Sequence, residues 1–372
     1  MFDSQHCDIC NAKAHTAQLP RRLMAITSTG LPWKERLPYK VCKSCGFIGS
    51  VYDEAWRKET AEIYSAYGDH PLGSVRCEEG LVSSPRGLKP RSQAFFEFIQ
   101  ENTKLPENGK LLDFGCGEGN TLRRASGIFL DQWTLYGYEI CSRQSSNWDA
   151  VIKIPRVADF FTEDPRNIQG TFDLITMVHV LEHVPLLVET LTKIRTNLTS
   201  GGCLAVIVPN FKEHPFQMMI ADHFSQFTMN SLSLVLARCG YDIILVDDSY
   251  VKKELIMLAT PAKPKKVTVD FEKYYDPNSY DQAFLPCLNY LSRMIELAEE
   301  KHYSSNIGIF GTSISGGVVA WAATGVVFIF CRRRPQGGKQ EISFKACFVS
   351  AECARGIRSY HCAAICNIEA RC

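Results

Sequence analysis

Runs of apolar residues predict an α/β sheet through the middle of the chain. Short buried strands are predicted at residues 110–114, 134–140, 172–178 and 203–208. Residues 91–102 carry apolar side chains at helical spacing, which predicts an amphipathic helix packed on the core. Two later runs, 241–246 and 254–259, predict a terminal strand pair joined by a charged loop. Strands that alternate with helices form a twisted, mostly parallel sheet.

Three glycines follow the first of these strands. Gly115, Gly117 and Gly119 alternate strictly, and helical character resumes just after them. About twenty residues beyond the last glycine, Glu139 lies near the C-terminal end of the second strand. Glycines let the backbone approach a ligand, and a carboxylate at this place accepts hydrogen bonds from ribose hydroxyls. The pattern therefore predicts a nucleoside site.

Asp113, two residues before the first glycine, distinguishes between two possible nucleoside ligands. Dinucleotide loops usually leave two residues before their third glycine, and the pyrophosphate sits on the helix N-terminus. Here Asp113 would repel a pyrophosphate but would hold the ammonium group of an amino acid. We therefore predict S-adenosylmethionine in preference to a nicotinamide dinucleotide. Trp133 and Tyr136 are assigned to the core, and Asp159 is a candidate partner for the adenine amino group.

Charge and the N-terminus narrow the function classes. Lys and Arg total 41 against 40 Asp and Glu, so the chain lacks the basic field that nucleic-acid binding uses. The first residues lack the basic region and apolar core of a secretory signal, so a reducing cytoplasm is expected. The sixteen cysteines are then not a disulfide framework.

Two Cys-x-x-Cys pairs lie near the N-terminus, Cys7 with Cys10 and Cys42 with Cys45. A two-residue spacer presents two sulfurs to one ion, and two pairs fill the tetrahedral shell of zinc. A filled shell leaves no position for water, so the predicted zinc is structural. The alternatives are four free thiols, or a redox pair at one of the two motifs.

The stretches 111–120, 137–140 and 172–184 resemble the class I S-adenosylmethionine-dependent methyltransferases, over roughly residues 105–262. With the cysteine pairs, the chain also resembles the zinc-containing sugar C-methyltransferases. The resemblance implies a Rossmann-like seven-stranded α/β sheet, an N-terminal zinc-binding segment and a smaller C-terminal α/β domain. It implies cofactor contacts from Asp113, Gly115, Cys116, Gly117, Gly119, Glu139 and His179.

That family carries a Tyr-x-Glu-His-x-Ser-Tyr-Phe segment with catalytic groups. The corresponding stretch here reads Ile220-Ala221-Asp222-His223-Phe224-Ser225-Gln226-Phe227, so both tyrosines are replaced. We hypothesise that His223 is the general base and that Asp222 orients it, with His179 and His183 as reserve candidates. The competing interpretation is that these histidines only pack or form structural hydrogen bonds.

The last third of the chain has two interpretations. Residues 307–330 hold no charge and precede three arginines, so they are long enough to span a bilayer. We favour a strand, a Gly-Thr-Ser turn, a helix over 315–323 and a strand over 326–330, as in a nucleotide-binding unit.

The tail after residue 330 is Cys-rich and Arg-rich and lacks apolar periodicity. Read one nucleotide later, permitted codons for residues 330–335 give an acidic stretch, which related C-terminal domains carry after this strand. We interpret residues 331–372 as translated out of frame and poorly ordered; the nucleotide sequence of the gene tests this. A rival is a second metal site formed by Cys347, Cys353, His361, Cys362 and Cys366, although the pair spacing is absent.

The predicted organisation has five parts. They are a zinc-binding segment (1–50), a helical linker (51–104), a methyltransferase domain (105–262), the start of a nucleotide-binding-like domain (263–330) and the anomalous tail (331–372). The predicted activity is methyl transfer to a small molecule, with a nucleotide-linked sugar as the leading acceptor. The alternative is a non-catalytic binding module that retains the fold and recognises a partner protein.

Overall fold

The computed structural model describes most of the chain. The described residues are 6–17, 24–28, 32–35, 38–66, 81–129, 132–140, 152–162, 164–262, 271–278, 280–304, 308–310, 327–336, 339–348 and 366–368. The helix expected over 315–323, most of the apolar stretch 307–330 and much of the tail lie outside these ranges. Within them, no helix is both long and apolar enough to cross a membrane.

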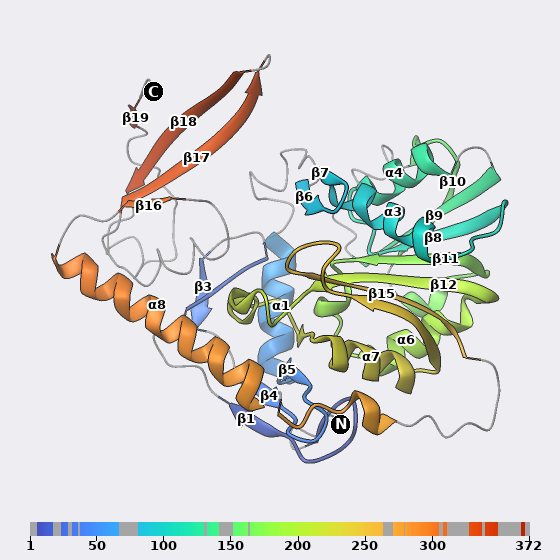
Figure 1. The fold of residues 1–372 in the computed structure, drawn as a ribbon, viewed down its shortest axis with the longest axis horizontal. Coiled ribbons are helices and arrows are strands. Elements are labelled where there is room, and N and C mark those ends of the chain that lie inside the picture. Colours follow the sequence, from blue (N-terminus) through green and yellow to red (C-terminus); the bar gives the residue numbers. More distant parts are fainter. Residues whose placement is uncertain are drawn as a thin grey trace.

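A seven-stranded sheet forms the centre of the structure (Figure 1). In spatial order its strands are β10 (Val157–Thr162), β9 (Trp133–Glu139), β8 (Gly109–Phe114), β11 (Phe172–Val178), β12 (Leu198–Pro209), β15 (Glu254–Pro261) and β14 (Tyr241–Asp247). The pairs from β10 to β12 are all parallel, and β15 runs antiparallel to both of its neighbours. The predicted, mostly parallel sheet is confirmed.

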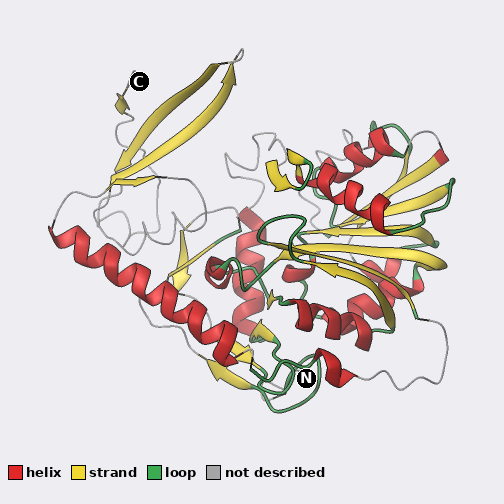
Figure 2. Ribbon diagram, in the orientation of Figure 1, coloured by secondary structure: helices red, strands yellow, loops and turns green. Residues whose placement is uncertain are grey.

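Helices cover both faces of this sheet (Figure 2). On one face lie α3 (Arg91–Asn102) and α4 (Asn120–Ile128), and on the other α6 (Leu187–Thr196) and α7 (Met229–Arg238). Alternate residues of each strand supply the two cores: Leu111 packs with α3 and α4, and Leu112 with α6 and α7. This alternation is the period-2 geometry of a strand.

The N-terminal segment builds a second, four-stranded sheet. Its order is β1 (His15–Ala17), β4 (Tyr39–Val41), β5 (Ile48–Ser50) and β13 (Ser225–Gln226). A separate ribbon pairs β2 (Met24–Ile26) with β3 (Pro32–Glu35). Because β13 comes from the middle of the chain, this sheet joins the N-terminal segment to the loop that follows β12.

The remaining described elements connect or flank these sheets. They are α1 (Glu54–Ala66), the hairpin of β6 (Leu81–Ser84) and β7 (Gly87–Pro90), the short helices η4 (Pro165–Asn167), η5 (Leu181–His183), η6 (Pro215–Met219), η7 (Phe271–Tyr274) and η8 (Tyr280–Phe284), and α8 (Leu285–Ser304). Helix α8, through Cys287 and Leu291, and η8, through Phe284, pack on η6 and the N-terminal sheet.

Four strands are described after α8. They are β16 (Gly308–Phe310), β17 (Val327–Gln336), β18 (Lys339–Phe348) and β19 (Cys366–Ile368). Strands β16 and β17 pair in parallel, and β17 and β18 form a hairpin. These pairings do not test the reading frame of the tail.

Candidate functional site

The glycine loop turns sharply between β8 and α4. Gly115, Gly117 and Gly119 all have positive φ, at 78°, 48° and 78°, a region that side chains with a Cβ rarely adopt. The amides of Gly115 and Cys116 both donate to the carbonyl oxygen of Tyr138, at 2.7 and 3.0 Å. The loop is therefore held against the end of β9, where Glu139 lies.

Two carboxylates flank this loop. A carboxylate oxygen of Glu139 accepts a 2.9 Å hydrogen bond from the amide of Gly117, which fixes Glu139 beside the glycines. Asp113 is buried at the end of β8 and accepts a 2.8 Å bond from the hydroxyl of Thr176 on β11. Cys116 is buried too, and burial, with the charges of Asp113 and Glu139, raises the pKa of its thiol. A glycine cradle between two carboxylates fits the nucleoside and amino-acid ends of S-adenosylmethionine.

The loop after β11 lies directly against the glycines. A Cβ on Gly115 would come within 2.3 Å of the Val180 side chain. Val180 lies between His179, which has a positive φ of 53°, and the η5 turn that carries Glu182 and His183. The structure thus brings the predicted cofactor residues and two of the candidate acid-base side chains, His179 and His183, to one edge of the sheet.

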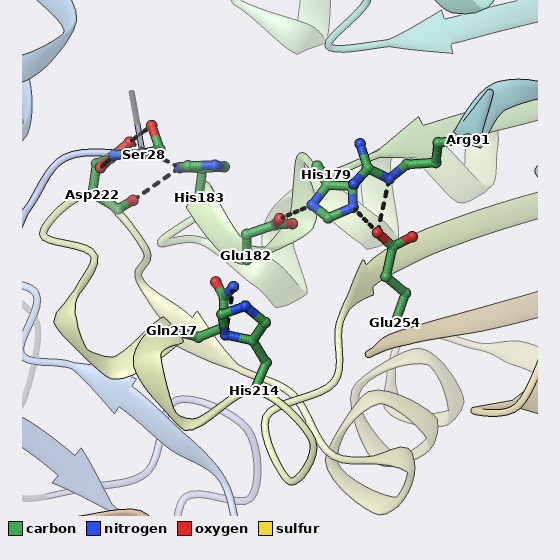
Figure 3. Close-up of polar contacts among 9 residues, drawn as sticks. All are labelled: Ser28, Arg91, His179, Glu182, His183, His214, Gln217, Asp222 and Glu254. Carbon is green, nitrogen blue, oxygen red and sulfur yellow. Dashed lines mark hydrogen bonds and ion pairs between the residues drawn. The ribbon is translucent and has the colours of Figure 1, made fainter. Parts of the chain in front are cut away.

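His179 lies between two carboxylates (Figure 3). Its Nδ1 is 3.2 Å from Glu182 and its Nε2 is 3.3 Å from Glu254, at the start of β15. Arg91, at the start of α3, donates to the same Glu254 oxygen at 2.8 Å. Burial and the Arg91 charge oppose ionisation, but the two carboxylates outweigh them and raise the pKa of His179 to about 9. A cationic ring with a carboxylate beside each nitrogen is unsuited to act as a base, so the reserve role of His179 as a base is not favoured.

The charge on His179 predicts a pH-dependent stability. The pKa of His179 in the folded protein, about 9, exceeds its ordinary value of 6.5, so the stabilisation is complete below the ordinary value. It is lost as the pH rises through about 9. We expect His179→Gln to lower the free energy of unfolding by about 2 kcal/mol at neutral pH and by much less above the folded pKa. Urea unfolding of both proteins across this range measures the difference; a constant difference would contradict the assignment.

His183 and His223 form a second group beside this network. Their rings lie at an interplanar angle of 84°, with centroids 4.6 Å apart. Nδ1 of His183 is 3.0 Å from the backbone oxygen of Asp222. A carbonyl oxygen only accepts, so this contact places a proton on Nδ1, and in a neutral ring Nε2 then carries the lone pair that a base requires.

Asp222 is fully buried and is held by the N-terminal segment. Its two carboxylate oxygens accept from the amide and the hydroxyl of Ser28, at 2.9 and 2.7 Å. One of them also lies 3.5 Å from Nδ1 of His183. The structure thus joins Asp222 to Ser28 and His183. That Asp222 orients the ring of His223 stays a prediction.

The N-terminal sheet holds the same stretch of chain by its backbone. Ala221 donates to Ile26 at 2.8 Å, and Ser50 donates to Phe224 at 2.6 Å. β13 follows immediately and pairs with β5. The N-terminal segment therefore bonds to the backbone on both sides of His223, at Ala221 and at Phe224.

The four N-terminal cysteines converge. Their Sγ atoms lie within 4.8 Å of one another, with Cys7 3.6 Å from Cys45 and Cys10 3.5 Å from Cys42. Four thiolates at about 2.3 Å around one zinc ion would be about 3.8 Å apart, so these spacings fit.

The two cysteine pairs also have the same backbone conformation. Asn11 and Gly46, each four residues after the first cysteine, have positive φ and donate to that cysteine's carbonyl at 3.0 and 2.9 Å. The residue after each of them accepts a bond from the same cysteine's amide. Two matching turns facing one point favour a shared ion over four unrelated thiols.

Sequence analysis missed several residues of the site. Ser28, Arg91 and Glu254 come from separate segments, and no local pattern marks them. Glu182 had a signal, since His179 and Glu182 are three residues apart and face each other across one turn.

Asp159, the candidate adenine partner, lies exposed on β10, and its carboxylate accepts from the amide of Phe160. Trp133 is buried and Tyr136 half-buried, stacked 6.2 Å from Phe161, as core residues would be.

The strand order and the glycine edge define an α/β protein with a nucleoside site at the C-terminal ends of its parallel strands. Residues 88–246 match the family model described as a methyltransferase domain. This match assigns a methyltransferase domain to residues 88–246, the part of the chain that holds the glycine loop and most of the seven-stranded sheet. The matched region begins at the β6–β7 hairpin and so includes α3, which sequence analysis placed in a linker.

Solved structures resemble only part of the chain. An S-adenosylmethionine-dependent methyltransferase from Clostridium acetobutylicum is 13% identical, with a TM-score of 0.40, over 56% of this chain and 99% of that one. One from Aquifex aeolicus is 16% identical, with a TM-score of 0.38, over 46% and 93%. CalO1, a methyltransferase of calicheamicin biosynthesis, is 19% identical, with a TM-score of 0.38, over 46% and 54%. No curated protein sequence matches.

Proposed function

We propose that this enzyme transfers a methyl group from S-adenosylmethionine to a small-molecule acceptor, with carbon methylation of a nucleotide-linked sugar as the leading reaction. One observation gives the strongest support for a reaction at the glycine-loop edge of the sheet. Val180 packs against Gly115 and is followed within three residues by His183, so the cofactor loop and the histidine pair adjoin.

The cofactor's sulfonium carries an already activated methyl group. The protein's tasks are to position the acceptor in line with it and to remove a proton from the acceptor. We assign cofactor binding to Asp113, the glycines 115, 117 and 119, Cys116 and Glu139, with His179 supporting the edge of the site.

His223 is the proposed general base. In carbon methylation it takes the proton from the acceptor carbon as the new carbon–carbon bond forms, and the sulfur–methyl bond breaks to leave S-adenosylhomocysteine. His183, whose Nε2 carries a lone pair, is the neighbouring candidate. The Cys7, Cys10, Cys42 and Cys45 cluster is proposed to hold a structural zinc that supports this arrangement.

Replacing His223 by alanine tests the base. We expect turnover on the acceptor to fall by roughly 10²- to 10⁴-fold while the affinity for S-adenosylmethionine stays near normal. Calorimetry measures the affinity and a radiolabelled-methyl assay measures turnover. The control is His15→Ala, which changes an exposed histidine on β1 and should affect neither. Unchanged turnover in His223→Ala would remove His223 from the mechanism.

Calorimetry followed by an acceptor screen tests the function itself. Binding of S-adenosylmethionine and of its demethylated product, with turnover on a nucleotide-linked sugar, would support the proposal. Tight cofactor binding without turnover on any acceptor would favour the non-catalytic binding module. Binding of a nicotinamide dinucleotide in place of both would overturn the cofactor assignment.

A further inference from the structure

Four side chains of alternating charge form a ladder that ends beside the histidine pair, His183 and His223. It runs from Arg91 on α3 to Glu254 on β15, then to His179 and finally to Glu182, through contacts of 2.8, 3.3 and 3.2 Å (Figure 3). Two cations and two anions alternate, so the ladder is electrically balanced. Such a balance is what allows charges to remain buried in a protein.

Glu182 is the buried end of this ladder. Its side chain is 1% exposed, and no hydrogen-bond donor reaches its second carboxylate oxygen among the described residues. A carboxylate oxygen of Glu182 and one ring nitrogen each of His183 and His223 all lie within 4.8 Å of one another. Its backbone carbonyl also accepts from the amide of Phe224 at 2.7 Å, which ties it to the residue after His223. A buried carboxylate this close to two imidazole rings can act on their charge.

The proposed reaction gives His223 a positive charge. An anion held a few ångströms away favours the charged form of a histidine and restricts the orientation of its ring. The charged and titratable groups around Glu182 come from four parts of the chain. They are His179 and His183 on its own loop, Asp222 and His223 on the loop before β13, Glu254 on β15 and Arg91 on α3.

We propose that Glu182 is a positioning residue that holds the protonated ring of His223 during methyl transfer, and that Arg91, Glu254 and His179 fix Glu182 for this role. The proposal rests on His223 being the base of the proposed function. The observation behind it is that a carboxylate oxygen of the buried Glu182 lies within 4.8 Å of a ring nitrogen of His223.

Proton titration of His223 tests this without any acceptor. Protein with ¹³C at the histidine Cε1 atoms is titrated by NMR, and the His223 signal is assigned by its loss in His223→Asn. In Glu182→Gln we expect the pKa of His223 to fall by about one unit. Glu213→Gln, which neutralises an exposed carboxylate, is the matched control and should leave it unchanged.

Glu182→Gln also removes one partner of the buried His179 cation, so that variant could misfold. The double variant Glu182→Gln, His179→Gln keeps the charge balance and is titrated in parallel. An unchanged His223 titration in a folded variant would overturn the proposal, whatever the acceptor screen gives. A lowered titration would support it even if no acceptor is found.

Discussion

Replacing Cys42 by serine is expected to remove the zinc that we propose for the cysteine cluster and to loosen the stretch of chain that carries His223. Binding of zinc by four thiolates contributes directly to folding in segments too small to build a core of their own. The sheet that the cysteine turns support pairs with β13 and bonds through Ser50 to Phe224, the residue after His223. We expect a loss of several kcal/mol, which lowers Tm by roughly 10 °C.

Three measurements separate this effect from general damage. Metal analysis should fall from about one zinc per chain to well below one. Hydrogen exchange should rise around residues 220–228, while S-adenosylmethionine still binds at the glycine loop, which no cysteine of the cluster forms. The control is Cys239→Ser, which changes a buried cysteine outside the cluster and should keep the zinc. A full zinc content in Cys42→Ser would contradict the metal assignment.

Elements defined by their own residues could be predicted from the sequence. The bounds of α3 and β11 agree with the predicted ones, because each has an apolar face with the period of its own structure. The glycine loop was also predictable, since its strand, glycines and acidic residue lie within one short stretch of chain. The order of the seven strands required the resemblance to a known family.

Contacts between segments that are far apart in the sequence could not be predicted in this way. Asp222 and Ser28 are 194 residues apart, and nothing in either local sequence names the other. β13 is two residues long and polar, so no periodicity marks it as the edge of the N-terminal sheet. β10, at the exposed edge of the main sheet, lacks the continuous apolar run by which the buried strands were recognised.

These distant contacts decide which groups do the chemistry. Sequence analysis took Asp222 as the partner of His223, because the two residues are adjacent in the chain. In the structure, the Asp222 carboxylate binds Ser28 and lies near His183, and a carboxylate oxygen of Glu182 lies within 4.8 Å of a ring nitrogen of each histidine. That Asp222 orients His223 stays a prediction, and Ser28 could not have been identified as its partner from the sequence.

Replacing Gly115 by alanine is expected to abolish most binding of S-adenosylmethionine. The new Cβ would lie 2.3 Å from Cγ2 of Val180, at a backbone φ of 78° that disfavours any side chain. The left-handed conformation costs about 1–2 kcal/mol and the overlap adds about as much. Together they predict a loss in affinity for S-adenosylmethionine of roughly 100-fold, measured by calorimetry.

Two companion variants show whether the collision is the cause. Gly127→Ala places the same methyl group on α4 where no heavy atom lies within 4 Å, so it should bind normally and be slightly more stable. Val180→Ala, added to Gly115→Ala, removes the obstructing side chain and should restore part of the affinity, leaving the cost of the backbone conformation. Normal binding by Gly115→Ala alone would mean that the cofactor does not lie over this loop. Because Val180 precedes Glu182 by two residues, displacing it should also disturb the histidine pair, so the single variant should lose more turnover than its cofactor affinity explains.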